Sequence, residues 1–437
     1  MRRALLLACL LLGLAVPATA HAALPPVRHV FVIVLENKDF DESFGPQSVA
    51  PYLATELTAR GALLTQYFGT SHQSLGNYIS MISGQAPNPA TQGDCPVFVD
   101  VVPGTLVGDG QALGQGCVYP KGVPTLADQL DARGLTWRGY MQSMTTPCRH
   151  PAIGMPDDTE RARVGDQYAV RHDPFVYFHS IIDDAARCQR GVVDLRALPG
   201  DLASTATTPN LSFITPDLCE DGHDEPCVDG RPGGLRSADA FLKAWVPAIL
   251  ASPAFRADGL LVVTWDEANF EDSDACCDEP MGVNTPAPGV TGPGGGRTGT
   301  VVVSPFVAPG TRTEQTYNHY SLLRTIEDLF GLAHLGYAAQ KGLRPFGDDV
   351  FSRPGGTAAS AAAGAGAAAA LRHCRTRVAV QRKRGGRTYL LIRSPRPGTV
   401  RGRRVRRCKA IHLRVRGRHG VVRLRLPGAR NVRVVRY

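Results

Sequence analysis

The chain has 437 residues, with 48 basic and 39 acidic side chains and a formal net charge of +9. The charge is divided unevenly, because residues 371–437 carry 23 Lys and Arg and no Asp or Glu, whereas residues 1–370 are acidic overall. Such an asymmetry suggests an anionic partner for the C-terminal part. Beyond the N-terminus, no stretch reaches the roughly 18 apolar residues of a membrane-spanning helix, so we expect a mature protein without a transmembrane segment.

The N-terminus has the pattern of a secretory signal. Met1-Arg2-Arg3 supply positive charge, an apolar run extends from Ala4 to Val16, and the small residues from Ala18 to Ala22 offer an Ala-x-Ala-like cleavage site. We predict a signal peptide over residues 1–22 and a secreted, extracellular protein. A retained membrane anchor is the alternative, although the apolar run is short for a bilayer.

Eleven cysteines occur, and Cys9 lies within the predicted signal, which leaves an even number. An even number in an exported chain favours disulfides, although counting alone does not fix their connectivity. Partners close in sequence are Cys95 with Cys117, Cys148 with Cys188, Cys219 with Cys227 and Cys374 with Cys408, which leaves the adjacent Cys276 and Cys277. A structural zinc site is the alternative, but the chain has no Cys-x-x-Cys pair.

Continuous apolar runs predict strands that are buried on both faces, as in a parallel sheet. These runs are His29–Leu35, Gly259–Trp265 and Gly299–Val303. Helical patterns lie at Ala50–Gly61, Leu75–Ser83, Thr125–Arg133, Ser237–Leu250 and Ser321–Phe330. The alternation of strands and helices predicts an α/β sandwich around a mostly parallel central sheet.

We expect this α/β domain over residues 25–353. Two long irregular regions within it, 87–124 and 268–298, are rich in Gly, Pro, Asp and Cys, and loops of this length are usually functional or held by disulfides. Residues 354–370 form an Ala/Gly-rich linker by composition. Short strand-like segments within residues 371–437 predict a small basic C-terminal β module, and a disordered basic tail is the alternative.

Two acidic clusters each follow an apolar run. Glu36-Asn37 follows the first run and Asp266-Glu267 follows the second. In open α/β sheets, sites gather at the carboxyl ends of the strands, and hard divalent cations prefer oxygen ligands. A helix N-cap or a solvated turn would explain one such pair alone. Two pairs that frame a Ser-x-x-Asn motif predict instead that Glu36, Asn37, Asp266 and Glu267 bind a divalent metal ion.

The Ser-x-x-Asn motif, Ser74-Leu75-Gly76-Asn77, supplies a hydroxyl nucleophile and an amide. Ser74 precedes an apolar helical pattern, and a helix N-terminus offers backbone N–H groups to a phosphate. Ser74 as a simple N-cap is the structural alternative. Asn77 lies one turn further on the same helix face, so its amide can donate to a phosphoryl oxygen. These parts together predict a metal-assisted phosphoester hydrolase.

Two histidines are candidates for the phosphate site. His172 and His223 lie in polar segments, where a histidine can donate to phosphate or protonate a leaving group. A lone histidine in a loop is more often simply exposed. Weaker candidates are His72, His319, Asp221 and Asp224.

Residues 28–335 resemble the bacterial secreted acid phosphatases and the non-specific phospholipases C, within the wider alkaline-phosphatase-like fold. The resemblance rests on five motifs in order: Val34–Lys38, Ser71–Tyr78, His172–Phe175, Thr264–Glu267 and Asn318–Thr325. It implies an alkaline-phosphatase-like three-layer sandwich in which Ser74 is the nucleophile. It also implies that Asn77, His172 and His223 contact the phosphate, that Glu36, Asn37, Asp266 and Glu267 bind metal, and that phosphoinositides and other monoesters are substrates.

The chain departs from these families at two places. Gly76 stands where the family usually has Pro, which predicts a more flexible loop. The segment after Glu267 lacks the Gly-rich, His-containing run of the plant phospholipases C. The nucleophile segment also lacks the x-Pro-x-Arg pattern of sulfatases, which excludes that reading.

These observations favour a secreted, metal-dependent phosphomonoesterase of the acid-phosphatase type that forms a phosphoseryl intermediate. Its substrate would be a phosphorylated small molecule or a phospholipid. A phospholipase C that cleaves phosphodiester lipids is one alternative. A protein that binds polyanions or cell wall through the basic C-terminal region is another. Specific nucleic-acid recognition is not expected, because no aromatic residues are interleaved with the arginines.

Overall fold

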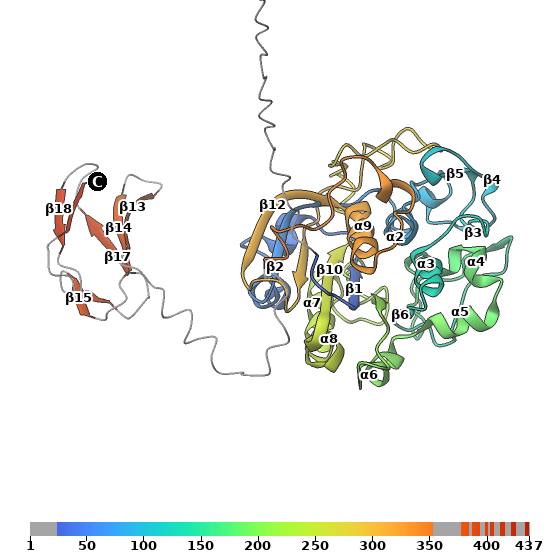
Figure 1. Cartoon of the computed structure of the whole chain (residues 1–437), viewed down its shortest axis with the longest axis horizontal. Helices are drawn as coiled ribbons and strands as arrows, with labels where there is room; N and C mark the ends of the chain where they lie inside the picture. The colour runs from blue at the N-terminus through green and yellow to red at the C-terminus, as the bar shows by residue number, and fades with distance from the viewer. Residues whose placement is uncertain are drawn as a thin grey trace, which may run out of the picture. The chain divides into compact units, whose positions relative to one another are not determined.

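The computed structural model describes residues 24–352 and, further on, the strands between residues 377 and 436 (Figure 1). The chain divides near residue 356 into two compact units. The predicted signal peptide, the linker and the Cys374–Cys408 disulfide lie outside the described residues. No helix in the described part of the chain has the length and apolar character needed to cross a membrane.

An eight-stranded sheet forms the centre of the first unit (Figure 1). Its strands are, in spatial order, β12 (Thr311–Asn318), β2 (Ala62–Phe68), β11 (Thr300–Val303), β10 (Gly259–Trp265), β1 (His29–Leu35), β9 (Leu211–Thr215), β6 (Trp137–Met141) and β8 (Val192–Asp194). All neighbouring pairs are parallel except the two that include β11. The predicted α/β class with a mostly parallel sheet is therefore confirmed.

Strand β11 differs from the expectation of a parallel strand. It pairs antiparallel with β10 on one side and with β2 on the other. The chain leaves the carboxyl end of β10 and returns through the long loop 268–298, without a helix that would carry it to the other edge of the sheet. Strand β11 therefore enters at the edge where β10 ends and runs in the opposite direction.

The two faces of the sheet bury separate hydrophobic clusters, because successive strand residues point to opposite faces. In β1, Val32 and Val34 belong to one cluster, and Phe31 and Ile33 belong to the other. Helices α2 (Ser74–Ser83), α3 (Leu126–Ala132) and α9 (His319–Phe330) pack in the first cluster, and α7 (Gly234–Ala251) and α8 (Pro253–Asp258) pack in the second. The unit is thus a three-layer sandwich, with both faces of β1 buried.

The predicted helices are present, with one difference in type. Residues 52–57 form a single π-helical stretch, Tyr52–Leu57, where the pattern predicted a longer helix. Asp239 of α7 accepts the backbone N–H groups of Tyr52 and Leu53 and thereby fixes the start of this stretch. Short helices complete the unit: α1 (Phe40–Phe44), α4 (His179–Ile182), α5 (Ala185–Gly191), α6 (Leu198–Asp201), and 3₁₀ turns at Thr91–Gly93, Gly108–Gly110, Val170–His172, Pro174–Tyr177, Leu195–Ala197 and Gly336–Ala339.

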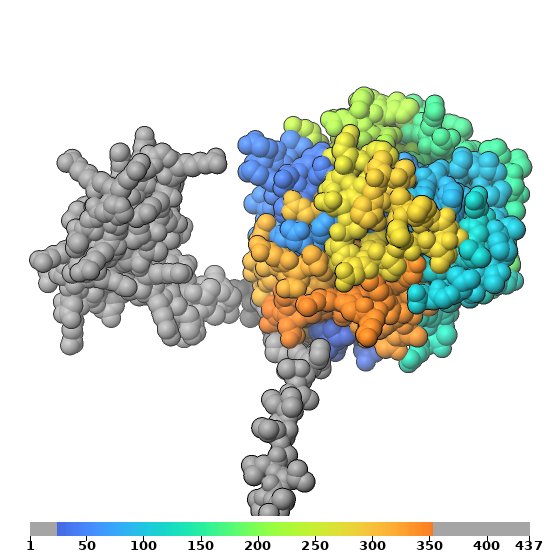
Figure 2. All heavy atoms as spheres, turned by 90° about the horizontal axis from the view of Figure 1, so that it is seen from above, coloured from blue at the N-terminus to red at the C-terminus, as the bar shows by residue number. Residues whose placement is uncertain are grey.

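The two irregular regions, 87–124 and 268–298, lie side by side. The Asn284 side chain donates to the carbonyl of Ala112 and accepts the N–H of Gly114, both at 2.8 Å, and Gln92 donates to the carbonyls of Ala287 and Pro288. Figure 2 shows residues 268–298, in yellow, spread over one face of the molecule beside the cyan residues of the earlier region. The earlier region contains β3 (Val97–Phe98), β4 (Val102–Leu106) and β5 (Ala112–Gln115), and β3 pairs with β7 (Met155–Pro156).

Three predicted disulfides are confirmed, Cys95–Cys117, Cys148–Cys188 and Cys219–Cys227, and the remaining adjacent pair, Cys276–Cys277, is also bonded. In the second unit, β13 (Arg377–Lys383), β14 (Arg387–Arg393) and β17 (Ile411–Val415) form an antiparallel sheet. Two further antiparallel pairs are β15 (Gly398–Val400) with β16 (Arg403–Val405), and β18 (Val421–Leu424) with β19 (Arg433–Arg436).

Truncation of the central strand tests the importance of this core. Ile33 is fully buried between the neighbouring strands β9 and β10, so Ile33→Ala is expected to lower the free energy of unfolding by about 2–5 kcal/mol. The control is Ile153→Ala, because Ile153 is 45% exposed in a turn. Urea denaturation measures both; equal stabilities of the two variants would contradict the assignment of β1 to the core.

Candidate active site

The ends of β1 and β10 bring the two acidic clusters together. The strands are parallel with Leu35 opposite Trp265, so the residues that follow them leave the sheet at the same level. The backbone N–H of Asn37 donates to Oδ1 of Asp266 at 3.0 Å, and its Nδ2 donates to Oε1 of Glu267 at 2.8 Å. The predicted metal-ligand residues therefore converge at the carboxyl edge of the sheet.

Ser74 is the first residue of α2, and its hydroxyl points at this acidic edge. It donates to Oε2 of Glu36 at 2.8 Å, while the hydroxyl of Tyr78 donates to Oε1 of the same carboxylate at 2.5 Å. The N-cap position belongs to Gln73, so the hydroxyl of Ser74 is not used as a helix cap. The side chain proposed as the nucleophile thus lies against a carboxylate of the acidic cluster.

Asn77 lies on the same face of α2 and connects the helix to its surroundings. Its Oδ1 accepts the backbone N–H groups of Thr70 and Ser71, each at 2.9 Å, and its Nδ2 donates to Oε2 of Glu267 at 2.9 Å. The amide therefore orients Glu267 in this structure. Its predicted contact with a phosphoryl oxygen stays a prediction.

His172 is buried beside Glu36 and stacks on Tyr78, with ring centroids 5.3 Å apart. Its Nε2 lies 3.5 Å from Oε2 of Glu36, and its Nδ1 lies 3.7 Å from Oδ2 of Asp221. Both ring nitrogens are buried without a hydrogen-bond partner. Burial, and then the charge of Arg171, hold the pKa of His172 well below its usual range, so the ring is neutral.

His223 lies further out, in the loop that follows β9. Its side chain is 53% exposed, and Nδ1 pairs with Oδ1 of Asp224 at 2.9 Å. The hydrogen bond with Asp224 raises the pKa of His223, against the opposing effect of burial. Together with Arg171 it lines a cavity of about 520 Å³. No described contact joins its ring to Ser74, so it differs from His172 both in position and in the direction of its pKa shift.

The histidines ranked as weaker candidates both touch the acidic edge. Nδ1 of His72 lies 3.2 Å from Oε1 of Glu267, and its Nε2 lies 2.9 Å from the carbonyl of Asp272. His319 bonds through Nε2 to the carbonyl of Asp266 at 2.5 Å, and burial lowers its pKa to about 4. These contacts hold Asp266 and Glu267, which are predicted metal ligands, in place, and they were not evident from the sequence.

Tyr78, Asp94 and Arg171 also contribute to the site and were not assigned from the sequence. Tyr78 is four residues after Ser74, a helical spacing that could have indicated a shared face. Asp94 accepts the backbone N–H of Leu75 at 2.9 Å, and the Nε of Arg171 lies 3.7 Å from its other oxygen. Asp94 belongs to the first irregular region, so no local pattern reveals its position.

The donor set of the acidic edge, three carboxylates and one amide, suits a hard divalent cation by its chemistry. Burial, and after it the charge of a neighbouring carboxylate, raises the pKa of Glu36, Asp266 and Glu267 well above the usual carboxyl range. Oδ1 of Asn37 and Oδ2 of Asp266 are buried without hydrogen-bond partners. Buried carboxylates require a compensating charge, and a set of carboxylate and amide oxygens is what such cations prefer.

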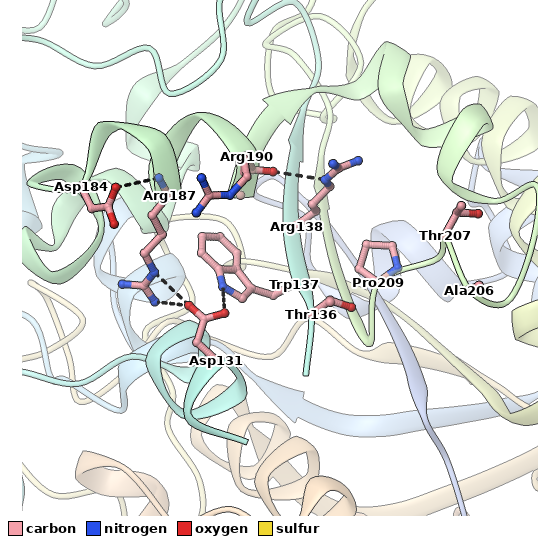
Figure 3. Close-up of a pocket in the computed structure, with 11 residues that line it drawn as sticks. Asp131, Thr136, Trp137, Arg138, Asp184, Arg187, Arg190, Ala206, Thr207 and Pro209 are labelled. Atoms are coloured by element: carbon pink, nitrogen blue, oxygen red, sulfur yellow. Dashed lines mark hydrogen bonds and ion pairs between the residues drawn. The ribbon is translucent and has the colours of Figure 1, made fainter. Parts of the chain in front are cut away.

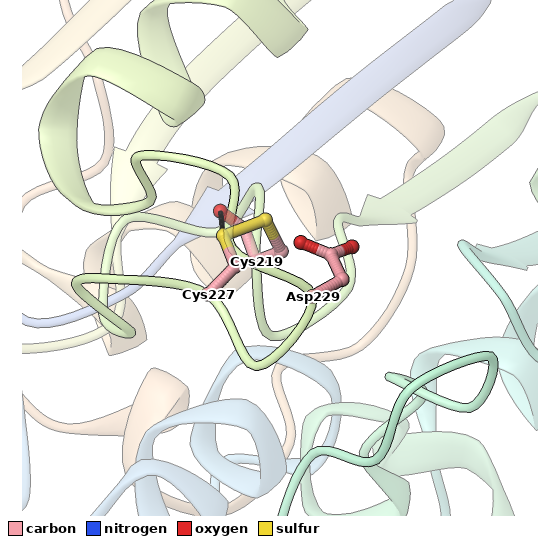
Figure 4. A group of neighbouring side chains, drawn as sticks. All are labelled: Cys219, Cys227 and Asp229. Carbon is pink, nitrogen blue, oxygen red and sulfur yellow. Dashed lines mark hydrogen bonds between the residues drawn. A yellow bond between two sulfur atoms is a disulfide. The ribbon is translucent and has the colours of Figure 1, made fainter.

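Two other features of the described residues do not resemble this site. Cys219, Cys227 and Asp229 lie close together, but the sulfurs are joined in a disulfide and are not available as thiolates (Figure 4). A cavity of about 410 Å³ lies at the amino end of β6, and Arg187, which lines it, is paired with Asp131 (Figure 3). Arg138, on the same cavity, is paired with Asp201.

A model of the phosphoesterase family matches residues 47–333, a span that contains Ser74, His172, His223 and Asp266-Glu267. The chain belongs to the phosphoesterase family. It is therefore a hydrolase that acts on phosphoric ester bonds, as the motifs predicted.

The relatives of this phosphoesterase include acid phosphatases. It is 28% identical to a phosphatidylinositol-3-phosphatase of Mycobacterium tuberculosis over 319 residues, which are 73% of this chain and 82% of that protein. It is 24% identical to an acid phosphatase of Aspergillus fumigatus over 307 residues, which are 70% of this chain but only 55% of that protein. The predicted resemblance to acid phosphatases is confirmed.

Among solved structures, a Vibrio parahaemolyticus protein in the alkaline phosphatase superfamily has a TM-score of 0.41 and 12% identity, over 86% of this chain and 79% of that chain. A similarity of this size decides nothing about function.

The packing of Gly76 yields a test of the α2 turn. Gly76 lies within the helix rather than in a flexible loop, and a Cβ there would be 2.5 Å from Oγ of Ser71. Gly76→Ala is therefore expected to displace Ser71 and shift Ser74, with a loss of about tenfold or more in kcat/KM. The control is Gly200→Ala in α6, where a Cβ meets no atom within 4 Å. Full activity of Gly76→Ala would contradict this packing.

Proposed function

We propose that the protein is a secreted, metal-dependent phosphomonoesterase of the acid-phosphatase type, with an alkaline-phosphatase-like arrangement of its site. The observation that carries the proposal is the 2.8 Å hydrogen bond from Ser74 to Glu36, at an edge where three buried carboxylates converge. A hydroxyl at a helix N-terminus beside a cation site is suited to attack phosphorus. The phosphoesterase family and the named acid phosphatases support the same reaction class.

Glu36, Asn37, Asp266 and Glu267 would hold the divalent metal ion, whose identity we leave open. When bound, the ion supplies positive charge that offsets the buried carboxylates, favours the deprotonated serine and neutralises the phosphoryl group. His72 and Asn77 contact Glu267 and orient its carboxylate from two sides. Such outer contacts are what fix ligand direction in metal sites.

In the proposed reaction, Oγ of Ser74 forms a bond to phosphorus while the bond from phosphorus to the alcohol oxygen breaks. The serine proton passes to Oε2 of Glu36, which already accepts its hydrogen bond. His223 gives a proton to the departing alcohol, because its pKa is raised and its ring reaches solvent. Water then cleaves the phosphoserine, with its proton returned to His223, while Ser74 recovers its proton from Glu36.

His172 and Asn77 are proposed to contact the non-bridging phosphoryl oxygens. The neutral ring of His172 has two buried nitrogens without partners beside Glu36, so a donor or acceptor is available there. Preorganised donors of this kind stabilise the charge that develops in the transition state. Nδ2 of Asn77 donates to the carbonyl of Ser71 and to Oε2 of Glu267, so it would exchange one of these bonds for a bond to the substrate.

Secretion is part of the proposal. Cys95, Cys117, Cys188, Cys219 and Cys227 are buried and disulfide-bonded, and bonds of this kind persist in oxidising compartments outside the cytosol. The signal-like pattern of residues 1–22 agrees with this location. Association of the basic residues 371–437 with an anionic surface would keep the enzyme near that surface.

A comparison of p-nitrophenyl phosphate with p-nitrophenyl phosphorylcholine tests the proposed reaction. The purified mature protein is expected to hydrolyse the monoester preferentially and to lose this activity when a chelator removes the metal. Preference for the choline diester would favour a phospholipase C. Absence of both activities would leave polyanion binding through the basic region as the function to examine.

Replacement of the nucleophile gives a direct test of Ser74. Ser74→Ala is expected to lower kcat by more than about a thousandfold, because the alanine side chain has no oxygen that could form the bond to phosphorus. The control is Ser83→Ala in the same helix, whose hydroxyl donates only to the carbonyl of Ile79. Stopped assays measure the turnover of both variants, and thermal melting checks that both are folded. Normal turnover of Ser74→Ala would exclude the mechanism.

The pH dependence should report His223. A raised pKa means that His223 stays protonated above its ordinary value of 6.5, and proton donation is lost as the pH rises through that raised value. His223→Asn is expected to lower kcat by about a hundredfold or more and to remove the decline at higher pH. His334→Asn, at a distant pair with Asp328, should keep the wild-type profile. A wild-type profile in His223→Asn would rule out the assigned proton donor.

A further inference from the structure

Arg171 is a cationic side chain among the buried carboxylates of the site, and the reaction outlined above does not use it. Its side chain is only 12% exposed. Burial opposes its charge, but Asp94, Glu36 and Asp221 lie close enough to raise the pKa of Arg171 in spite of that. A guanidinium kept in such a place requires an anionic partner of matching geometry.

The contacts of Arg171 leave part of its hydrogen-bonding capacity open. Its Nη1 donates to the carbonyl of Glu160 at 3.0 Å, and its Nε lies 3.7 Å from Oδ2 of Asp94. Within residues 24–352, the described hydrogen bonds and ion pairs of Arg171 involve only these two nitrogens. A guanidinium has five N–H donors in a planar fork, so donors remain for a phosphoryl group.

Asp94 connects Arg171 to the nucleophile. One oxygen of Asp94 accepts the backbone N–H of Leu75, the residue directly after Ser74, at 2.9 Å, and the other faces Arg171. Asp94 itself sits in a left-handed turn, with φ of 54°, immediately before the Cys95–Cys117 disulfide. The disulfide-held loop thus fixes the guanidinium relative to the first turn of α2.

Arg171 also borders an open cavity. The cavity, about 520 Å³ in volume, has a mostly charged and polar lining that includes Arg171 and His223, with Leu218, Pro226 and Val228 as apolar members. This volume lies within the range of small-molecule sites, and the polar lining suits a hydrophilic ester. Arg171 therefore lies between the acidic edge that holds Ser74 and a space open to a substrate.

We propose that Arg171 binds the phosphoryl group of the substrate, that Asp94 positions Arg171, and that the cavity beside them takes the alcohol part of the ester. This inference rests on the proposed phosphomonoesterase function and assigns residues that this function did not require. Asp94 acts only through Arg171 and the helix turn, so it is a positioning residue.

Inorganic phosphate is the probe for Arg171, because it shares the phosphoryl group but has no alcohol. In the metal-loaded protein, Arg171→Met is expected to raise both the KM for p-nitrophenyl phosphate and the inhibition constant of phosphate by on the order of 10- to 100-fold. Arg171→Lys keeps the charge without the planar fork and should give a smaller increase. The control is Arg163→Met, an exposed arginine outside the cavity, which should leave both constants unchanged.

Asp94→Asn separates the two roles of Asp94. The amide oxygen can still accept the N–H of Leu75, but the charge that holds Arg171 is lost. In Asp94→Asn, the inhibition constant of phosphate is expected to rise by about three- to tenfold, which is less than the rise in Arg171→Met. An unchanged constant in Asp94→Asn would overturn the positioning role.

Phosphate binding without turnover separates this inference from the proposed function. In Ser74→Ala, phosphate should raise the melting temperature, and the additional change Arg171→Met should abolish that shift. If the wild type proves inactive on monoesters but the shift depends on Arg171, the phosphate site stands and the proposed function fails. If folded Arg171→Met and Arg171→Lys bind phosphate as the wild type does, the inference is wrong. If Arg171→Met does not fold, Arg171→Lys decides.

Discussion

The buried negative charge at the ends of β1 and β10 is the constraint on which the rest of this site depends. Glu36, Asp266 and Glu267 are all less than 5% exposed, and Asn37, which directly follows Glu36, donates to the other two carboxylates. Carboxylates in such a place are costly unless a cation and hydrogen bonds compensate them. The side chains of Ser74 and His72 contact these carboxylates and help to meet that requirement. The same arrangement places the hydroxyl of Ser74 beside the buried carboxylates.

The two irregular regions have a structural role in this arrangement. The loop 268–298 begins directly after Glu267 and provides the carbonyls that accept hydrogen bonds from Ser71 and His72. The region 87–124 contributes Asp94, which binds the first turn of α2. The disulfide Cys95–Cys117 and the contacts of Asn284 hold the regions in position. A site built on loops is thereby fixed by covalent and hydrogen-bonded supports.

Much of the fold and of the acidic edge was predictable because the information is local. Strands β1 and β10 are continuous apolar runs, and an acidic pair at the end of each parallel strand places Glu36 and Asp266 at one edge. Strands β2, β6, β8, β9 and β12 were not predicted. Strand β12 is an edge strand with mostly polar residues and no long buried run. The antiparallel direction of β11 depends on the path of a loop, which no short pattern records.

The residues that orient the candidate catalytic groups were not predictable for a related reason. Asp94 and Arg171 lie 77 positions apart in sequence, and their pairing exists only once two loops have folded together. The stacking of His172 on Tyr78 is likewise a tertiary contact. Sequence motifs predicted the groups that we propose to carry the chemistry, whereas the residues that orient those groups come from parts of the chain without a local signal.

The metal content of the active protein tests the central claim most directly. We predict that the purified wild type contains stoichiometric divalent metal by elemental analysis, and that Asp266→Asn, which removes one buried carboxylate charge, loses both metal and activity while still folded. Metal-free protein that retains full activity after exhaustive chelation would contradict the account.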